Sequence, residues 1–163
     1  MRSFGFPNPV NEVSARVVAS GVVLMAGTAI LLRAPLLLIP LTYGFLARVL
    51  TGPTLSPLGQ LATRVVTPLL PFAPRYVAGP PKRFAQGVGL VTTTLASVAY
   101  FGFGWDSATY GLLGVLVVAA GLEAFAGLCL GCKMFVLLMR AGLISESVCL
   151  DCANIWDRAP QAA

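Results

Sequence analysis

The chain has 163 residues, of which 57% are hydrophobic and only 10% are charged. A soluble domain of average composition has about 25% charged residues and needs them to cover its surface. The composition therefore excludes a soluble globular protein and a disordered chain, and it indicates an integral membrane protein. The net charge of +5 comes from basic residues scattered singly or in pairs. Because no aromatic-studded basic face results, nucleic acid is excluded as a partner.

Apolar stretches predict an all-α fold with about four transmembrane helices, which together form a domain over residues 1–128. The first, 13–32, has the length of about 20 residues that a bilayer core requires. The second, 36–50, contains Pro40, so it is either a span or a kinked re-entrant element. The third and fourth, 84–103 and 109–128, are separated by a short turn, which predicts a helical hairpin.

A proline-rich segment separates the second stretch from the third. Its seven prolines between Thr51 and Arg83 exclude a straight spanning helix. Within it, Ser56 followed by Pro57 is typical of a helix start, and apolar residues then recur at helical spacing. This pattern predicts a helix over 57–70 that lies in the membrane interface or packs on the spans of the protein itself.

The basic residues predict the orientation. With four spans, 10 of the 11 lie on one side of the membrane and only Arg33 lies on the other. By the positive-inside rule, both termini and the long middle segment are then cytoplasmic. The C-terminal segment 129–163 is accordingly expected to be a cytoplasmic tail.

All four cysteines lie in this tail, with the spacing C-x2-C-x16-C-x2-C, at Cys129, Cys132, Cys149 and Cys152. Two C-x-x-C pairs separated by 15 to 20 residues are a recurrent zinc spacing. The chain has no histidine, so a zinc ion would take all four thiolates, and such a closed site is structural. An iron-sulfur cluster accepts the same four ligands.

Thiol redox chemistry is the main alternative to a metal, because two C-x-x-C pairs are able to pass a disulfide to a partner. The run from Cys129 to Met134 is similar to the active-site run of thioredoxins, although a membrane helix precedes it here rather than a strand. Structural disulfides are disfavoured in the cytoplasm. A fourth reading takes the cysteines as small apolar side chains.

Three charged residues near the spans are further candidates. Glu123 is the only acidic residue inside a predicted span, and we expect it to accept a proton in thiol chemistry or to pair with Arg16, Arg48 or Arg83. Lys82 and Arg83 precede the third span and are expected to contact lipid headgroups. Small residues close to Glu123 predict tight helix packing, within the chain or in a homo-oligomer. These are Ala120, Ala124, Gly127 and Gly131.

Three runs of the sequence are distinctive: Gly79 to Gln86, Ser56-Pro57-Leu58-Gly59, and Gly127-x-Cys129-x-Gly131-Cys132. Together they resemble the bacterial family of unknown function numbered 4395, over residues 5–145. The resemblance implies a small multi-pass protein of the bacterial inner (plasma) membrane, with Cys129 and Cys132 as family-pattern residues. Members are often found near thioredoxin-like or rhodanese-like proteins, which implies a partner of this kind.

We therefore predict a small membrane protein of thiol or sulfur redox traffic, whose two C-x-x-C pairs form one cluster that exchanges disulfides or binds a metal. The alternative is a non-enzymatic accessory subunit of a larger membrane complex, with a structural four-cysteine zinc site. Whether the chain is an enzyme is left open by the sequence.

Overall fold

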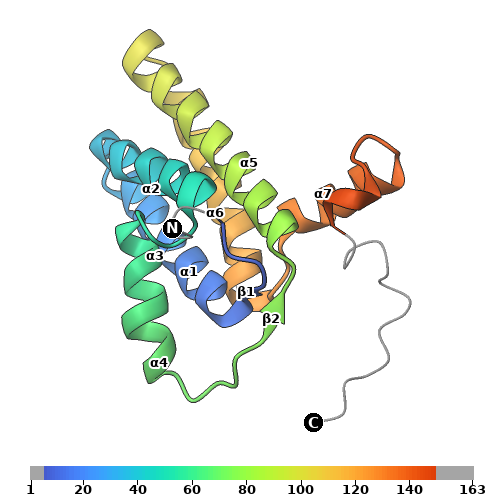
Figure 1. Cartoon of the computed structure of the whole chain (residues 1–163). Helices are drawn as coiled ribbons and strands as arrows, with labels where there is room; N and C mark the ends of the chain where they lie inside the picture. The colour runs from blue at the N-terminus through green and yellow to red at the C-terminus, as the bar shows by residue number, and fades with distance from the viewer. Residues whose placement is uncertain (1–5, 150–163) are drawn as a thin grey trace.

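The computed structural model describes residues 6–149, and these are mostly helical, which confirms the all-α class (Figure 1). The long helical segments follow the predicted spans. They are α1 (Glu12–Leu31), the short 3₁₀ turn η1 (Pro35–Leu37) leading into α2 (Leu38–Thr51), α5 (Gly79–Ser97) continued by the π-helical η3 (Val98–Gly102), and α6 (Asp106–Ala126). A further helix, α7 (Leu130–Arg140), and a 3₁₀ turn, η4 (Glu146–Val148), follow.

The long helices pack in two pairs, α1 against α6 and α2 against α5. The two pairs share one core, to which all four helices contribute and in which small residues permit close approach. At Gly89 of α5, for example, an added Cβ would overlap the ring of Phe45 from α2. Core side chains include Val22, Ala26, Ala29, Leu38, Leu41, Ala96, Leu113, Leu116 and Ala120.

The outward faces of these helices are apolar, contrary to what a soluble bundle would show. Leu24 of α1, Ile39 of α2, Leu95 of α5 and Val118 of α6 are all more than half exposed. Within residues 6–149, three helices are long and apolar enough to cross a membrane: Glu12–Leu31, Gly79–Gly102 and Asp106–Ala126. The segment Pro35–Thr51 is apolar but shorter, so it corresponds to the stretch that the sequence left between a span and a re-entrant element.

The middle segment contains the predicted helix over 57–70, as α3 (Pro57–Leu61), the π-helical η2 (Ala62–Val66) and α4 (Thr67–Leu69). The Ser56 hydroxyl accepts a hydrogen bond from the Gly59 amide, as its position before Pro57 predicts. The apolar residues of this helix face two directions. Ala62 is buried against α1, whereas Leu61 and Leu69 are exposed, so the helix combines packing on the spans with an apolar face left for lipid.

Two features were not expected from the sequence. β1 (Val10–Asn11) and β2 (Tyr76–Val77) form a short antiparallel pair that ties the N-terminal residues to the start of α5. In addition, α5 begins at Gly79 rather than near Phe84, with Pro80 and Pro81 in its first turn. Proline is favoured there because the first amides of a helix have no intrahelical partner.

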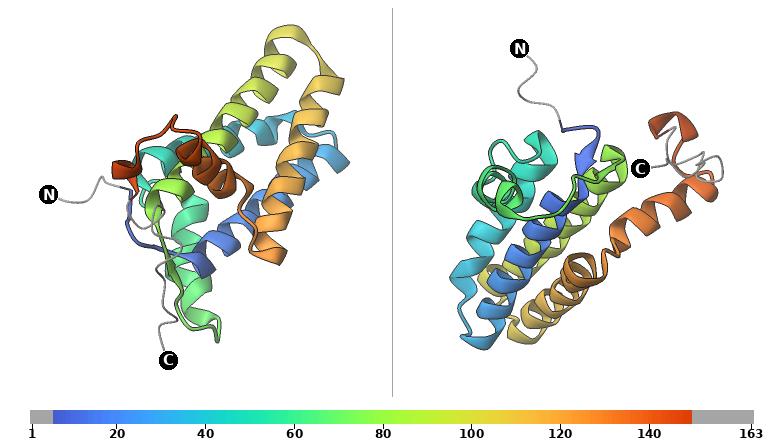
Figure 2. Two further views of the ribbon diagram at one scale, coloured as in Figure 1. Left: turned by 90° about the vertical axis from the view of Figure 1, so that its right-hand side faces the viewer. Right: turned by 90° about the horizontal axis from the view of Figure 1, so that it is seen from below.

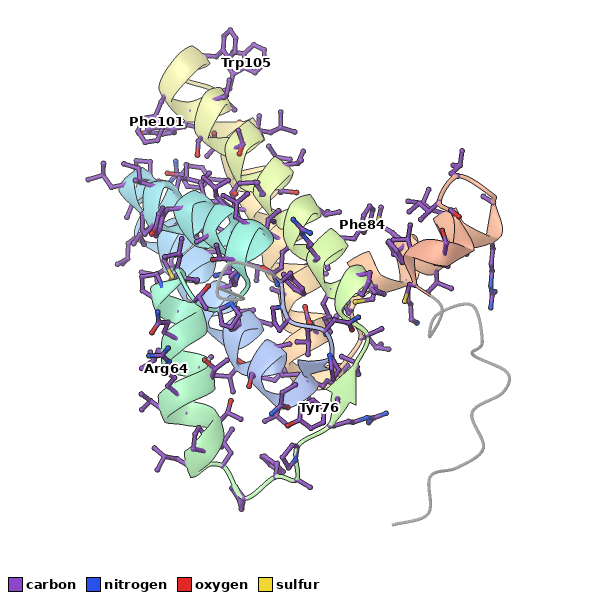
Figure 3. The ribbon with its side chains drawn as sticks, in the orientation of Figure 1. Arg64, Tyr76, Phe84, Phe101 and Trp105 are labelled. Carbon is purple, nitrogen blue, oxygen red and sulfur yellow. The ribbon has the colours of Figure 1, made fainter. Side chains whose placement is uncertain are left out.

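Helix α7 projects from the bundle as a short arm (Figures 1 and 2). It contacts mainly the first turns of α5. Gly131 makes this close approach possible, since a Cβ at Gly131 would lie 2.6 Å from the Cα of Ala85. Opposite the arm, Phe103 and Trp105 stack at the α5–α6 turn with ring centroids 5.0 Å apart, and Figure 3 shows Trp105 at this tip.

Candidate thiol site

An ion pair lies where α5 begins and α6 ends. Nζ of Lys82 is 2.5 Å from Oε1 of Glu123, and the side chains are only 9% and 13% exposed. Glu123 therefore has an internal partner, as one of the two sequence interpretations required, but that partner is Lys82 and not an arginine. Lys82 does not extend to lipid headgroups as predicted, because its ammonium group is turned into the protein.

The arginines proposed as partners for Glu123 make other contacts. Arg16 donates to the carbonyl oxygens of Ala124 and Phe125, at 3.1 and 3.0 Å, and so caps the end of α6. Arg83 donates to the Val49 carbonyl at 2.9 Å and is exposed. Its contact with headgroups remains a prediction.

Arg48 forms a buried polar cluster that the sequence did not reveal. Its Nε donates to Oε1 of Gln86 at 2.7 Å and its Nη1 to the Ser56 hydroxyl at 3.1 Å. The guanidinium also lies over the Phe45 ring, 4.6 Å from the centroid. These contacts connect α2, α5 and the start of α3, and they hold the carboxamide of Gln86 in place.

The chain between α6 and α7 brings the first C-x-x-C pair to the same end of the bundle. Gly127 ends α6 with φ of +66°, a conformation that favours glycine. Cys129 then has extended backbone and becomes the N-cap of α7. Its Sγ accepts a hydrogen bond from the Cys132 amide at 3.3 Å. Cys129 and Cys132 are both free thiols.

The two thiols differ in exposure and in acidity. Cys129 is only 8% exposed, whereas Cys132 is half-buried. Hydrogen bonding from Cys132 lowers the pKa of Cys129. Burial and the negative charge of Glu123 raise this pKa, the positive charge of Lys82 lowers it, and the net shift is downward. The same hydrogen bond and burial raise the pKa of Cys132. Cys129 is thus the better thiolate, as expected at a helix N-terminus.

Cys149 directly follows η4 and packs against α7. It is buried with Phe135 and Met139 in a small apolar cluster, next to the contact between Phe84 and Phe135, whose ring centroids are 5.6 Å apart. Cys149 is disulfide-bonded, contrary to the expectation that a cytoplasmic tail would lack structural disulfides. Cys152 lies outside the described residues. In the part of the chain that is described, no three metal-ligating side chains gather at one point, and the cluster of four cysteines stays a prediction.

Sequence reasoning missed the pairing of Lys82 with Glu123 because it placed the start of the third helix too late. The signal was present in Gly79-Pro80-Pro81, since prolines in a first helical turn would have put Lys82 inside the helix. The buried position of Arg48 was indicated less clearly by the sequence. Arg48 is a cation at the end of an apolar stretch, and such a residue needs an internal partner.

The family of unknown function DUF4395 matches residues 10–140 of the chain. This range includes the ion pair, Cys129 and Cys132, and it ends before Cys149 and Cys152. No curated protein and no solved structure matches the chain. The match covers most of the sequence, and the chain therefore belongs to the DUF4395 family.

Proposed function

We propose that this protein is a membrane-bound dithiol-disulfide exchange protein, in which Cys129 and Cys132 are the reacting pair. The observation that carries the proposal is the geometry of the pair: the Cys129 sulfur caps the N-terminus of α7 and accepts the amide proton of Cys132. A sulfur in this position is stabilised as a thiolate by the amides of the first helical turn.

The partner in this proposal is a soluble dithiol protein of the thioredoxin-like or rhodanese-like kind. The protein itself is placed in the bacterial inner membrane, with the pair on the cytoplasmic side. The orientation rests on the excess of basic residues on that side, and the membrane location on the three long apolar helices.

The exposures of the two cysteines indicate the direction of attack. With the pair oxidised, a partner thiolate attacks Sγ of Cys132, which is the more exposed sulfur. The bond between Cys129 and Cys132 breaks, and Cys129 leaves as a thiolate, which is favoured because a thiol of lower pKa is the better leaving group. A second partner thiolate then attacks the partner sulfur of the mixed disulfide and releases Cys132, so that the partner becomes the disulfide and the pair becomes the dithiol.

Trapping of mixed disulfides tests this proposal. A lone thiol at Cys132 is accessible and has lost its resolving neighbour, so Cys129→Ser should accumulate mixed disulfides with soluble thiol proteins after acid quenching. Cys132→Ser should trap far less, because Cys129 is buried. The Cys149→Ser variant is the matched control and should behave like the unaltered chain. Equal trapping by all three variants, or by none, would contradict the proposal.

The second candidate function is that of a non-enzymatic accessory subunit with a zinc knot, and the C-x2-C-x16-C-x2-C spacing favours it. Cys129 and Cys132 are free to ligate, but the disulfide at Cys149 would first have to be reduced. About one zinc per chain in anaerobically purified protein, together with loss of partner binding in Cys149→Ser, would favour this function over the exchange of disulfides. Iron in place of zinc would indicate a cluster that transfers electrons.

A further inference from the structure

A cavity of about 200 Å³ lies among the helices. It is lined mainly by residues of α5 and α6, together with Val18 and Val22 of α1, Phe45 of α2 and the first turn of α7. Figure 2 shows that α5 and α6 diverge from their common turn, with the beginning of α7 near their separated ends. Val115 lines the cavity and is 65% exposed on the outward apolar face, so the cavity opens sideways toward the lipid-facing surface.

Most of the polar lining of the cavity gathers at one end. Cys129, Glu123 and Gln86 line it where α7 begins, whereas toward the α5–α6 turn the lining is aliphatic except for Thr92, whose hydroxyl donates to the Val88 carbonyl. The carboxamide of Gln86 is fixed by Arg48 through its oxygen, and its amino group supplies donors for a carbonyl ligand. A cavity with this polarity suits an elongated apolar molecule that has a carbonyl-bearing head.

Cys129 and Cys132 differ in the surroundings that they face. Cys129 lines the cavity and is 8% exposed, whereas Cys132 is the more exposed thiol and is not among the lining residues. The cavity is thus a route to Cys129, whereas the molecular surface is a route to Cys132.

We propose that the cavity binds an isoprenoid quinone, whose head lies against Cys129 and Gln86 and oxidises the Cys129–Cys132 dithiol. This inference rests on the proposed function, because it supplies the oxidant that restores the disulfide after each exchange. In the reaction, a bond forms between the two Sγ atoms and both S–H bonds break. The two electrons and two protons pass to the quinone, whose two carbonyl groups become the hydroxyl groups of a quinol.

The test uses the full chain in lipid nanodiscs. The parent protein carries Cys149→Ser and Cys152→Ser, so that Cys129 and Cys132 are its only thiols. The reduced protein is mixed with decylubiquinone, and remaining thiols are counted by alkylation and mass spectrometry. We expect one quinol for each disulfide formed. Ala119→Phe places a ring in the cavity and should slow this oxidation by roughly tenfold or more, because the ring takes the space that the quinone would occupy.

Val118→Phe is the matched control, because Val118 is 62% exposed on the same helix and does not line the cavity. It should react with decylubiquinone like the parent, and the soluble oxidant diamide should oxidise all three proteins equally. A wild-type rate in Ala119→Phe would overturn the inference. If the pair exchanges with thioredoxin but is never oxidised by decylubiquinone, the quinone site fails and the proposed function stands. If the pair reacts with neither, both fail.

Discussion

Lys82 and Glu123 place opposite charges in a largely apolar interior. Their contact of 2.5 Å and low exposure mean that neither charge is balanced by water. Desolvation offsets much of the attraction in such a pair, so its net stabilisation is small, but removal of one partner leaves the other charge buried and alone. Single and double substitutions should therefore have very different effects.

We expect Glu123→Gln to lower the free energy of unfolding by about 3–5 kcal/mol, the usual cost of breaking a buried pair. The free energy of unfolding should fall much less in the double variant Lys82→Met with Glu123→Leu, because no charge remains uncompensated. Thermal unfolding in mild detergent measures both. Equal losses in the single and double variants would show that the ion pair does not behave as a buried one. Arg75→Ala, which breaks a pair whose arginine side chain is 79% exposed, is the control with little expected effect.

At the scale of elements, the position of α7 decides where the thiols lie. This helix is held to α5 by the close approach of Gly131 to Ala85 and by the contact of Phe84 with Phe135. The left-handed Gly127 sets the direction in which the chain leaves α6. Gly127 and Gly131 thus determine where Cys129 and Cys132 lie, although neither glycine has a reactive side chain.

Gly131→Val should displace α7 from α5 and expose Cys129, since its added carbons would overlap Ala85. The expected result is faster alkylation of Cys129 by a water-soluble maleimide, approaching the rate at Cys132. Gly87→Ala on α5 is the matched control, because nothing lies within 4 Å of its added carbon. An unchanged Cys129 rate in Gly131→Val would mean that this contact does not hold the arm.

Much of the element layout was predictable because membrane helices are marked by length and apolar composition. The turn at Trp105 and the helix start at Ser56 were likewise local signals. The site was only partly predictable. Cys129 and Cys132 are three positions apart in the sequence, so it was visible that they lie close together, whereas the pairing of Lys82 with Glu123 depends on how two distant helix ends meet. The difference in exposure between Leu61 and Ala62 could not be predicted from periodicity, since lipid and protein both favour apolar residues.

At the scale of the whole molecule, the charge distribution predicts one orientation. The turn at Trp105 and the pair at Cys129 and Cys132 lie at opposite ends of α6, so they face opposite sides of any membrane that α6 crosses. In the orientation that we propose from the positive-inside rule, the cysteines are in the cytoplasm.

A cysteine introduced at Asp106 in a cysteine-free chain should therefore react with a membrane-impermeant maleimide added to intact cells. Cys132 alone in the same background should react only after the cells are opened. The reverse pattern would place the pair outside the cytoplasm and would remove the argument for a cytoplasmic partner.

We propose that Cys129 and Cys132 form a reversible disulfide. To test this, the protein in nanodiscs is equilibrated against thiol-disulfide buffers of known potential, and alkylated cysteines are counted by mass spectrometry. We expect these two thiols to disappear together in one two-electron transition, at a potential between about −300 and −120 mV, the range of thiol-exchange proteins. Two thiols that never pair with each other, at any potential of the buffer, would contradict this proposal.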